Sequence, residues 1–104
     1  MVEDAAVTPQ DAYAALRDGA SLIDVREPWE YEQIRIPGAV LIPLGELPQR
    51  MDEIATGKDV YVHCRMGNRS ARAVDFLRAH GYARSFNVAG GIDAWKEAGL
   101  PVAE

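Results

Sequence analysis

One cysteine, Cys64, lies between a strand-forming run and a segment rich in glycine and arginine. The run Val60–His63 precedes it, and the residues CRMGNRS occupy positions 64–70. This order predicts a strand, then a tight loop, then the N-terminus of a helix. The free N–H groups and partial positive charge of a helix N-terminus bind anions, and a loop wrapped ahead of them adds further N–H donors.

A cysteine at the start of such a loop is expected to be reactive. The N–H dipoles, together with Arg65 and Arg69, would stabilise the thiolate and so lower the pKa of the Cys64 thiol. Gly67 allows a positive φ, and Asn68 tolerates the left-handed region better than most residues. Because the thiolate is the nucleophilic form, we interpret Cys64 as a nucleophile and not as an inert core residue.

Two kinds of cysteine chemistry fit this arrangement. A cysteine phosphatase needs five residues between its cysteine and the arginine that clamps the phosphate, whereas only four separate Cys64 from Arg69. A ring of amides contracted in this way suits a smaller anion, such as the terminal sulfur of a persulfide. The spacing therefore favours sulfur transfer over phosphate hydrolysis.

The elements that must position Cys64 alternate between helix and strand. Thr8 followed by Pro9 is a helix N-terminus, with Thr8 as N-cap. Helical patterns cover residues 9–18, 28–36, 44–54, 69–80 and 92–98, and strand patterns cover 22–25, 39–42, 60–63 and 85–88. This alternation predicts an α/β fold, with a mostly parallel central sheet of four to five strands flanked by helices on both faces. Cys64 would then lie at the carboxyl end of a strand, where such sheets bind ligands.

Composition limits the classes of function. The 104 residues predict one domain over 1–104, with 48% hydrophobic and 26% charged residues, as in ordinary globular domains. A net charge of −5 disfavours nucleic acid as a partner, but five arginines cluster within a stretch that contains one acid, which suggests a small anionic ligand. These are Arg65, Arg69, Arg72, Arg78 and Arg84.

Location and metal content follow from what the sequence lacks. No segment is apolar enough to span a bilayer, so no membrane association is expected. The N-terminal residues MVEDAAVTP do not resemble an export signal, so we expect a cytoplasmic protein. One cysteine and two histidines without ligand spacing predict neither a disulfide within the chain nor a metal site.

Three separated motifs follow one another along the chain. They are Asp24-Val25-Arg26-Glu27-Pro28 with Glu30-Tyr31 and Ile36-Pro37-Gly38-Ala39, the loop Cys64–Ser70, and Gly90-Gly91-Ile92 with Trp95 and Gly99-Leu100-Pro101-Val102. In this order they resemble the motifs of the rhodanese family of sulfurtransferases in its single-domain form. The resemblance covers about residues 7–102.

The resemblance implies transfer of a sulfane sulfur through a persulfide on Cys64, with no cofactor beyond that covalent sulfur. The donor would be thiosulfate or another small anionic persulfide source, and the acceptor cyanide, a thiol or a sulfur-carrier protein. By the family pattern Arg65 would bind the sulfonate end of the donor and Arg69 would assist. The loop amides would cradle the sulfur, so the implied binding residues are Arg65, Met66, Gly67, Asn68, Arg69 and Ser70.

Two alternative hypotheses about the function remain open. A phosphatase or arsenate-type reductase would use the same cysteine, and the loop length argues against it. A rhodanese-like domain kept only for protein contacts would not need the cysteine and the glycine-bearing loop, both of which are present.

Several further residues have structural interpretations. His63 precedes Cys64 on a strand, so the two side chains point to opposite faces and a Cys–His dyad is not expected. Asp24 and Arg26 are predicted to form an ion pair with Glu30 that ties the strand to the next helix. Trp29 and Trp95 are predicted to pack in or near the core.

Overall fold

Five parallel strands form one central sheet in the computed structural model, which describes residues 5–104. The spatial order is β1-β5-β4-β2-β3, so the strand that leads to Cys64 is the middle one. The predicted α/β class with a parallel sheet is confirmed. The strands are β1 (Ala6–Val7), β2 (Ser21–Asp24), β3 (Val40–Leu41), β4 (Val60–His63) and β5 (Ser85–Val88).

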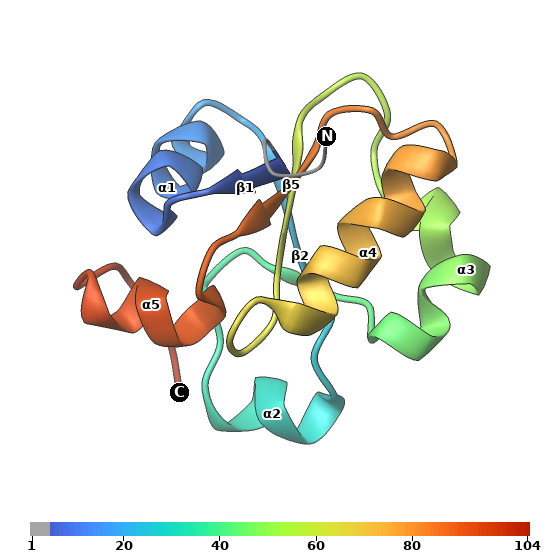
Figure 1. The fold of residues 1–104 in the computed structure, drawn as a ribbon. Coiled ribbons are helices and arrows are strands. Elements are labelled where there is room, and N and C mark those ends of the chain that lie inside the picture. Colours follow the sequence, from blue (N-terminus) through green and yellow to red (C-terminus); the bar gives the residue numbers. More distant parts are fainter. Residues whose placement is uncertain (1–4) are drawn as a thin grey trace.

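Helices cover both faces of this sheet, as predicted (Figure 1). Figure 1 shows α1 and α5 on one side of the strands and α3 and α4 on the other, with α2 beyond the end of the sheet near the loop that leads into α4. The helices are α1 (Pro9–Arg17), α2 (Pro28–Gln33), α3 (Leu47–Arg50), α4 (Asn68–Ala79) and α5 (Gly91–Glu97).

Local sequence signals mark the residues at which the longer helices begin. The Thr8 hydroxyl accepts a hydrogen bond from Asp11 N at 3.0 Å, as expected of an N-cap. Gly67 precedes α4 with a φ of +108°, a left-handed conformation that favours glycine. The helix therefore begins immediately after the loop that contains Cys64.

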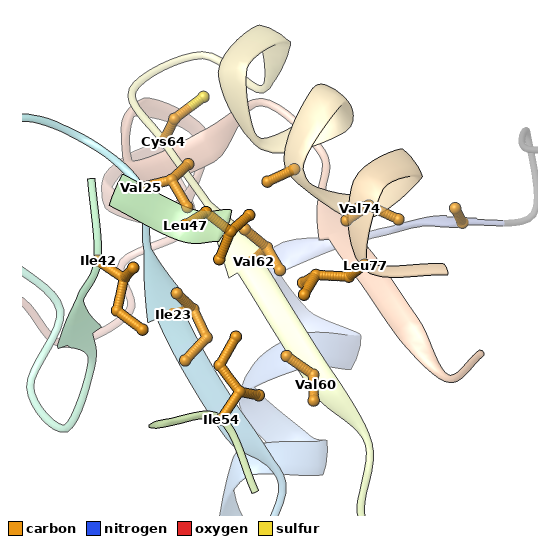
Figure 2. Packing of buried hydrophobic residues seen from close by; sticks show 12 residues of the cluster. Ile23, Val25, Ile42, Leu47, Ile54, Val60, Val62, Cys64, Val74 and Leu77 are labelled. Carbon is orange, nitrogen blue, oxygen red and sulfur yellow. The ribbon is translucent and has the colours of Figure 1, made fainter. Parts of the chain in front are cut away.

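The hydrophobic core has two halves, one on each face of the sheet. The half under α3 and α4 includes Ile23, Val62 and Leu77, and Cys64 lies at one end of it beside the start of α4 (Figure 2). The half under α1 and α5 includes Trp95, whose side chain is buried and donates its indole N–H to Pro101 O at 2.7 Å.

The segment 44–54 is not the continuous helix that its pattern predicts. Leu44–Glu46 and Met51–Glu53 are 3₁₀ turns, and only α3 between them is α-helical. Pro48 has no N–H to donate, and the chain must turn so that Leu47 and Ile54 both enter the core. Tertiary packing, rather than helical periodicity, determines this segment.

Three smaller differences concern strands and an aromatic residue. The strand predicted at 39–42 is limited to β3, and Ala39 belongs to the preceding turn, where its N–H donates to Ile36 O at 3.1 Å. The two-residue strand β1, which pairs with β5, has no counterpart among the predicted strands. The interpretation of Trp29 as a core residue is wrong, since 62% of its surface is exposed.

Within residues 5–104, no helix is both long enough and apolar enough to cross a membrane. The N-terminal stretch expected not to be an export signal begins with residues 1–4, which lie outside the described part of the chain.

Candidate active site

Strand β4 delivers Cys64 to the carboxyl edge of the sheet. It pairs with β2 on one side and β5 on the other, and all four of its residues are buried. The chain leaves β4 at Cys64, forms the loop and enters α4 at Asn68. The Cys64 residue is 2% exposed, and its sulfur points toward the start of α4 (Figure 2).

Backbone N–H groups of the loop surround the sulfur. Gly67 N donates to Cys64 Sγ at 3.1 Å and Ser70 N does so at 3.4 Å. Burial raises the pKa of the Cys64 thiol, but the hydrogen bonds that its sulfur receives in the loop, those from the N–H groups of Ser70, Gly67 and Met66 among them, outweigh burial, so the pKa lies below its ordinary value. The arrangement stabilises a negative charge on this sulfur, or on an atom bonded to it.

The N-terminus of α5 gives the loop its orientation. Ile92 N donates to Cys64 O at 2.9 Å, and Asp93 N donates to Arg65 O at 3.1 Å. Because a peptide plane directs its C=O and N–H to opposite sides, holding these carbonyls against α5 turns the following N–H groups toward the inside of the loop. Gly91 allows this contact, since a Cβ there would overlap the Cys64 and Arg65 carbonyl oxygens.

A side-chain network joins the loop to β5. Ser70 Oγ lies 3.3 Å from Cys64 Sγ and 2.6 Å from Asn87 Oδ1. Asn87 Nδ2 donates to Gly67 O at 3.1 Å. Asn87 thus contacts Gly67 and Ser70, the two residues whose N–H groups donate to the Cys64 sulfur.

Arg69 forms an ion pair with Glu30 of α2 and does not point over the loop. Its two terminal nitrogens lie 2.7 and 3.0 Å from the two carboxylate oxygens, and Glu30 also accepts from Glu27 N at 2.9 Å. The Arg69 guanidinium is the main cause that lowers the pKa of Glu30 to about 2. The pair ties α2 to the first turn of α4.

The expected ion pair between Arg26 and the Glu30 carboxylate is wrong. Arg26 instead donates to both carboxylate oxygens of Asp24, and it reaches the main-chain carbonyls of Glu30 and Ile34 at 3.5 and 2.7 Å. The tie between strand and helix exists, but it runs through main-chain atoms. The Glu30 carboxylate is thereby left to Arg69.

His63 has the structural position predicted for it. Its Nδ1 lies 3.1 Å from Cys64 O, so the ring holds the main chain of the cysteine and not its sulfur. The other ring nitrogen lies 3.5 Å from Asp24 Oδ2 and has no hydrogen-bond partner within the described part of the chain. Burial lowers the pKa of His63 despite the nearby Asp24 carboxylate.

Exposed side chains form the rim of the site. Met66 is 62% exposed, and the Arg65 side chain is 66% exposed with its Nε 3.5 Å from Asp93 Oδ2. A shallow cleft of about 240 Å³ lies beside Arg65 and is lined also by Trp29 and Lys96. This cleft lies between α2 and α5.

The predicted binding residues of the loop therefore take different positions relative to the Cys64 sulfur, and Arg69 is turned to Glu30. Gly67 and Ser70 contact the sulfur, Arg65 and Met66 face outward, and Asn68 is exposed at the start of α4. Among residues 5–104, no group of three His, Cys, Asp or Glu side chains is arranged to hold a metal ion.

Sequence reasoning missed two partners of the loop, Glu30 as the ligand of Arg69 and Asn87. A signal for Asn87 was available, because an amide in a central strand needs hydrogen-bond partners when it is shielded from water. No local signal pairs Glu30 with Arg69, since 39 positions separate them.

Comparison with known proteins places this site in context. A family model described as a rhodanese-like domain matches residues 8–98. The chain is 44% identical over 81 residues to a protein named sulfurtransferase from Allochromatium vinosum, covering 78% of this chain and 76% of that protein. It is 31% identical over 96 residues to the thiosulfate sulfurtransferase GlpE of Pseudomonas syringae, covering 92% and 91% of the two chains.

A solved structure gives the same picture. The crystal structure of a rhodanese-related protein from Thermoplasma volcanium matches with a TM-score of 0.87 and 36% identity, covering 94% of this chain and 96% of that one. Several other curated relatives are longer, and the chain spans between 19% and 60% of their length.

Proposed function

Because the chain belongs to the rhodanese-like domain family, we propose that it is a sulfurtransferase that carries a sulfane sulfur as a persulfide on Cys64. The observation that supports this proposal best is the ring of N–H donors around the sulfur, with Gly67 N at 3.1 Å and Ser70 N at 3.4 Å. These donors favour the thiolate before transfer and the charged terminal sulfur after it.

The first half-reaction loads the cysteine. The Cys64 thiolate attacks the outer sulfur of thiosulfate, a new S–S bond forms, and the bond to the sulfonate sulfur breaks. Sulfite leaves with that electron pair, and the negative charge stays on the terminal sulfur of the persulfide. Arg65 is our candidate for the sulfonate contact, because its guanidinium is exposed beside the cleft and is held only by Asp93 at 3.5 Å.

The second half-reaction unloads it. Cyanide or a thiolate attacks the terminal sulfur, and the electron pair of the S–S bond returns to Cys64 as the thiolate. Thiocyanate or a new persulfide leaves, so neither half-reaction needs a redox partner or a cofactor. A small thiol or the terminus of a sulfur-carrier protein could serve as acceptor, and the reduced cysteine suits a cytoplasmic location.

Phosphate hydrolysis is the alternative that the geometry supports less well. Only four residues separate Cys64 from Arg69, and the Arg69 guanidinium is engaged by Glu30 instead of facing the sulfur. A phosphoryl group would therefore lack the clamp that a cysteine phosphatase requires.

The test is sulfur loading on the intact chain. After incubation with thiosulfate, the wild type should gain the mass of one sulfur atom and should form thiocyanate when cyanide is added. Cys64→Ser removes the sole cysteine and should show neither. Turnover by Cys64→Ser above the uncatalysed rate, or a wild type that no sulfane donor loads, would reject the proposal.

A further inference from the structure

The Ser70 hydroxyl stands between two groups that compete for its single proton. Its oxygen lies 2.6 Å from Asn87 Oδ1 and 3.3 Å from Cys64 Sγ. A hydroxyl donates one hydrogen bond at a time and accepts through its lone pairs. The direction of the proton therefore decides whether Ser70 stabilises a thiolate or a thiol.

The orientation of the Asn87 amide settles that direction in the resting site. The Gly67 carbonyl oxygen is only an acceptor, so the group that faces it at 3.1 Å must be the donor Nδ2. Oδ1 then faces Ser70, and because Oδ1 is itself only an acceptor, the Ser70 proton must lie between these two oxygens. Ser70 Oγ consequently presents a lone pair to Cys64 Sγ, which a thiol S–H can satisfy and a thiolate cannot.

We propose that Asn87 is a positioning residue that limits the acidity of Cys64 by holding the Ser70 proton away from the sulfur. This inference rests on the proposed function, because it concerns the same nucleophile. When Cys64 ionises, Ser70 can turn its proton to the sulfur only by breaking its bond to Asn87. The thiolate is then left mainly to the backbone N–H groups, of which Gly67 N is the nearest to the sulfur.

The charged groups around the sulfur do not give the same control. Arg69 on α4 is paired with Glu30 on α2, and Arg65 is close to Asp93 on α5. Each of the two guanidinium groups already lies beside a carboxylate.

The buried polar groups on the neighbouring strands are likewise engaged away from the sulfur. On β4 and β2, burial lowers the pKa of His63, and Asp24 is paired with Arg26. Among the groups near the sulfur within residues 5–104, the Ser70 hydroxyl is the one whose hydrogen bond can change partner as Cys64 ionises.

The experiment titrates the cysteine of the reduced, substrate-free protein. Thiolate absorbance and the rate of alkylation by iodoacetamide, each followed against pH, report on Cys64 alone because the chain has one cysteine. Asn87→Ala and Asn87→Leu should each lower the midpoint by about one pH unit, the size expected when one hydrogen bond turns to a charged sulfur. Leucine fills the space of the amide, so a water molecule cannot replace Asn87 as the acceptor.

The decisive quantity is the part of this shift that depends on Ser70. In a Ser70→Ala background the same Asn87 substitutions have no hydroxyl to release, so the downward shift should disappear. Any change that remains measures the lost contact to Gly67 O. Gln10→Ala, which removes an exposed amide on α1, should leave the titration unchanged.

Equal shifts with and without Ser70, or no downward shift in variants that keep the wild-type Tm, would overturn the inference. Its failure is distinct from failure of the proposed function, which is read from sulfur loading of the wild type. A wild type that loads sulfur while the titrations show no dependence on Ser70 would reject the role of Asn87 alone. A wild type that cannot be loaded would reject the proposed function while the titration still decides the role of Asn87.

Discussion

Removing the charge of Glu30 should destabilise the protein in a pH-dependent way. The Glu30 carboxylate is 10% exposed, receives both terminal nitrogens of Arg69 and also caps α2 through Glu27 N. Glu30→Gln keeps the shape of the side chain but removes its charge. The substitution therefore isolates the ionic part of the contact between α2 and α4.

The magnitude follows from the pKa of Glu30, which falls from 4.5 to about 2, chiefly because of the hydrogen bonds from Arg69. At about 1.36 kcal/mol per pH unit, this shift corresponds to about 3 kcal/mol of folding free energy at neutral pH. The Arg69 side chain is 34% exposed, so solvent screens part of the interaction. We expect Glu30→Gln to lower the free energy of unfolding by about 2 kcal/mol at pH 7.

The pH dependence distinguishes charge from packing. Because the folded pKa of Glu30 is lower than the unfolded one, its contribution is complete above pH 4.5 and is lost as the pH falls toward 2. The difference between wild type and Glu30→Gln should therefore shrink, to roughly 40 per cent of its pH 7 value at pH 3.

Urea unfolding from pH 7 to pH 3, followed by tryptophan fluorescence, measures this difference. Glu32→Gln is the matched control, because Glu32 lies on the same helix, is exposed and forms no ion pair within residues 5–104. A difference that stays constant with pH would refute the electrostatic reasoning. So would a loss at pH 7 no larger than that of Glu32→Gln.

Three further predictions concern the loop and its anion. Arg65→Ala should raise the KM for thiosulfate roughly tenfold, and more than Arg72→Ala, because a charge-assisted contact contributes on the order of 1.5–3 kcal/mol. Steady-state kinetics of both variants compare the two KM values. Equal effects would mean that only the overall positive charge of the arginine cluster matters and not a direct contact from Arg65. Gly91→Ala should lower the free energy of unfolding by about 3 kcal/mol or more, since φ is +62° and the Cβ would overlap two loop carbonyls. Gly99→Ala, with φ +77° in open space, should cost only about 1 kcal/mol by urea unfolding, and similar losses would contradict the close approach of α5. The wild type should not hydrolyse aryl phosphates usefully in a chromogenic assay, and hydrolysis through Cys64 faster than any sulfur transfer would reverse the argument from loop length.

Features that depend on neighbouring residues could be predicted from the sequence. The Thr8 N-cap, the strand Val60–His63 and the helix that follows the loop all depend on contacts within a few positions. The same locality placed Cys64 at the carboxyl edge of a parallel sheet, since alternating strands and helices leave few topologies. The fold class and the candidate nucleophile could therefore be predicted from the sequence alone.

Features that depend on tertiary packing could not be predicted from the sequence. The segment 44–54 has a helical pattern, yet it breaks into turns so that both of its ends can bury side chains. Trp29 is a large aromatic residue of the kind usually found in a core, but it lies exposed at the rim of the site. In both cases the deciding energy comes from residues distant in the chain, which local periodicity does not encode.

The site itself divides in the same way. The loop residues Cys64–Ser70 are contiguous, so their types and spacing indicated an anion-binding loop around a cysteine. Its supports come from elsewhere in the chain. Glu30 binds Arg69, the N-terminus of α5 holds two loop carbonyls, and Asn87 Oδ1 accepts a hydrogen bond from the Ser70 hydroxyl. Each pairing depends on directional hydrogen bonds between groups that approach only when the sheet has formed, so only the tertiary structure decides which side chains control the cysteine.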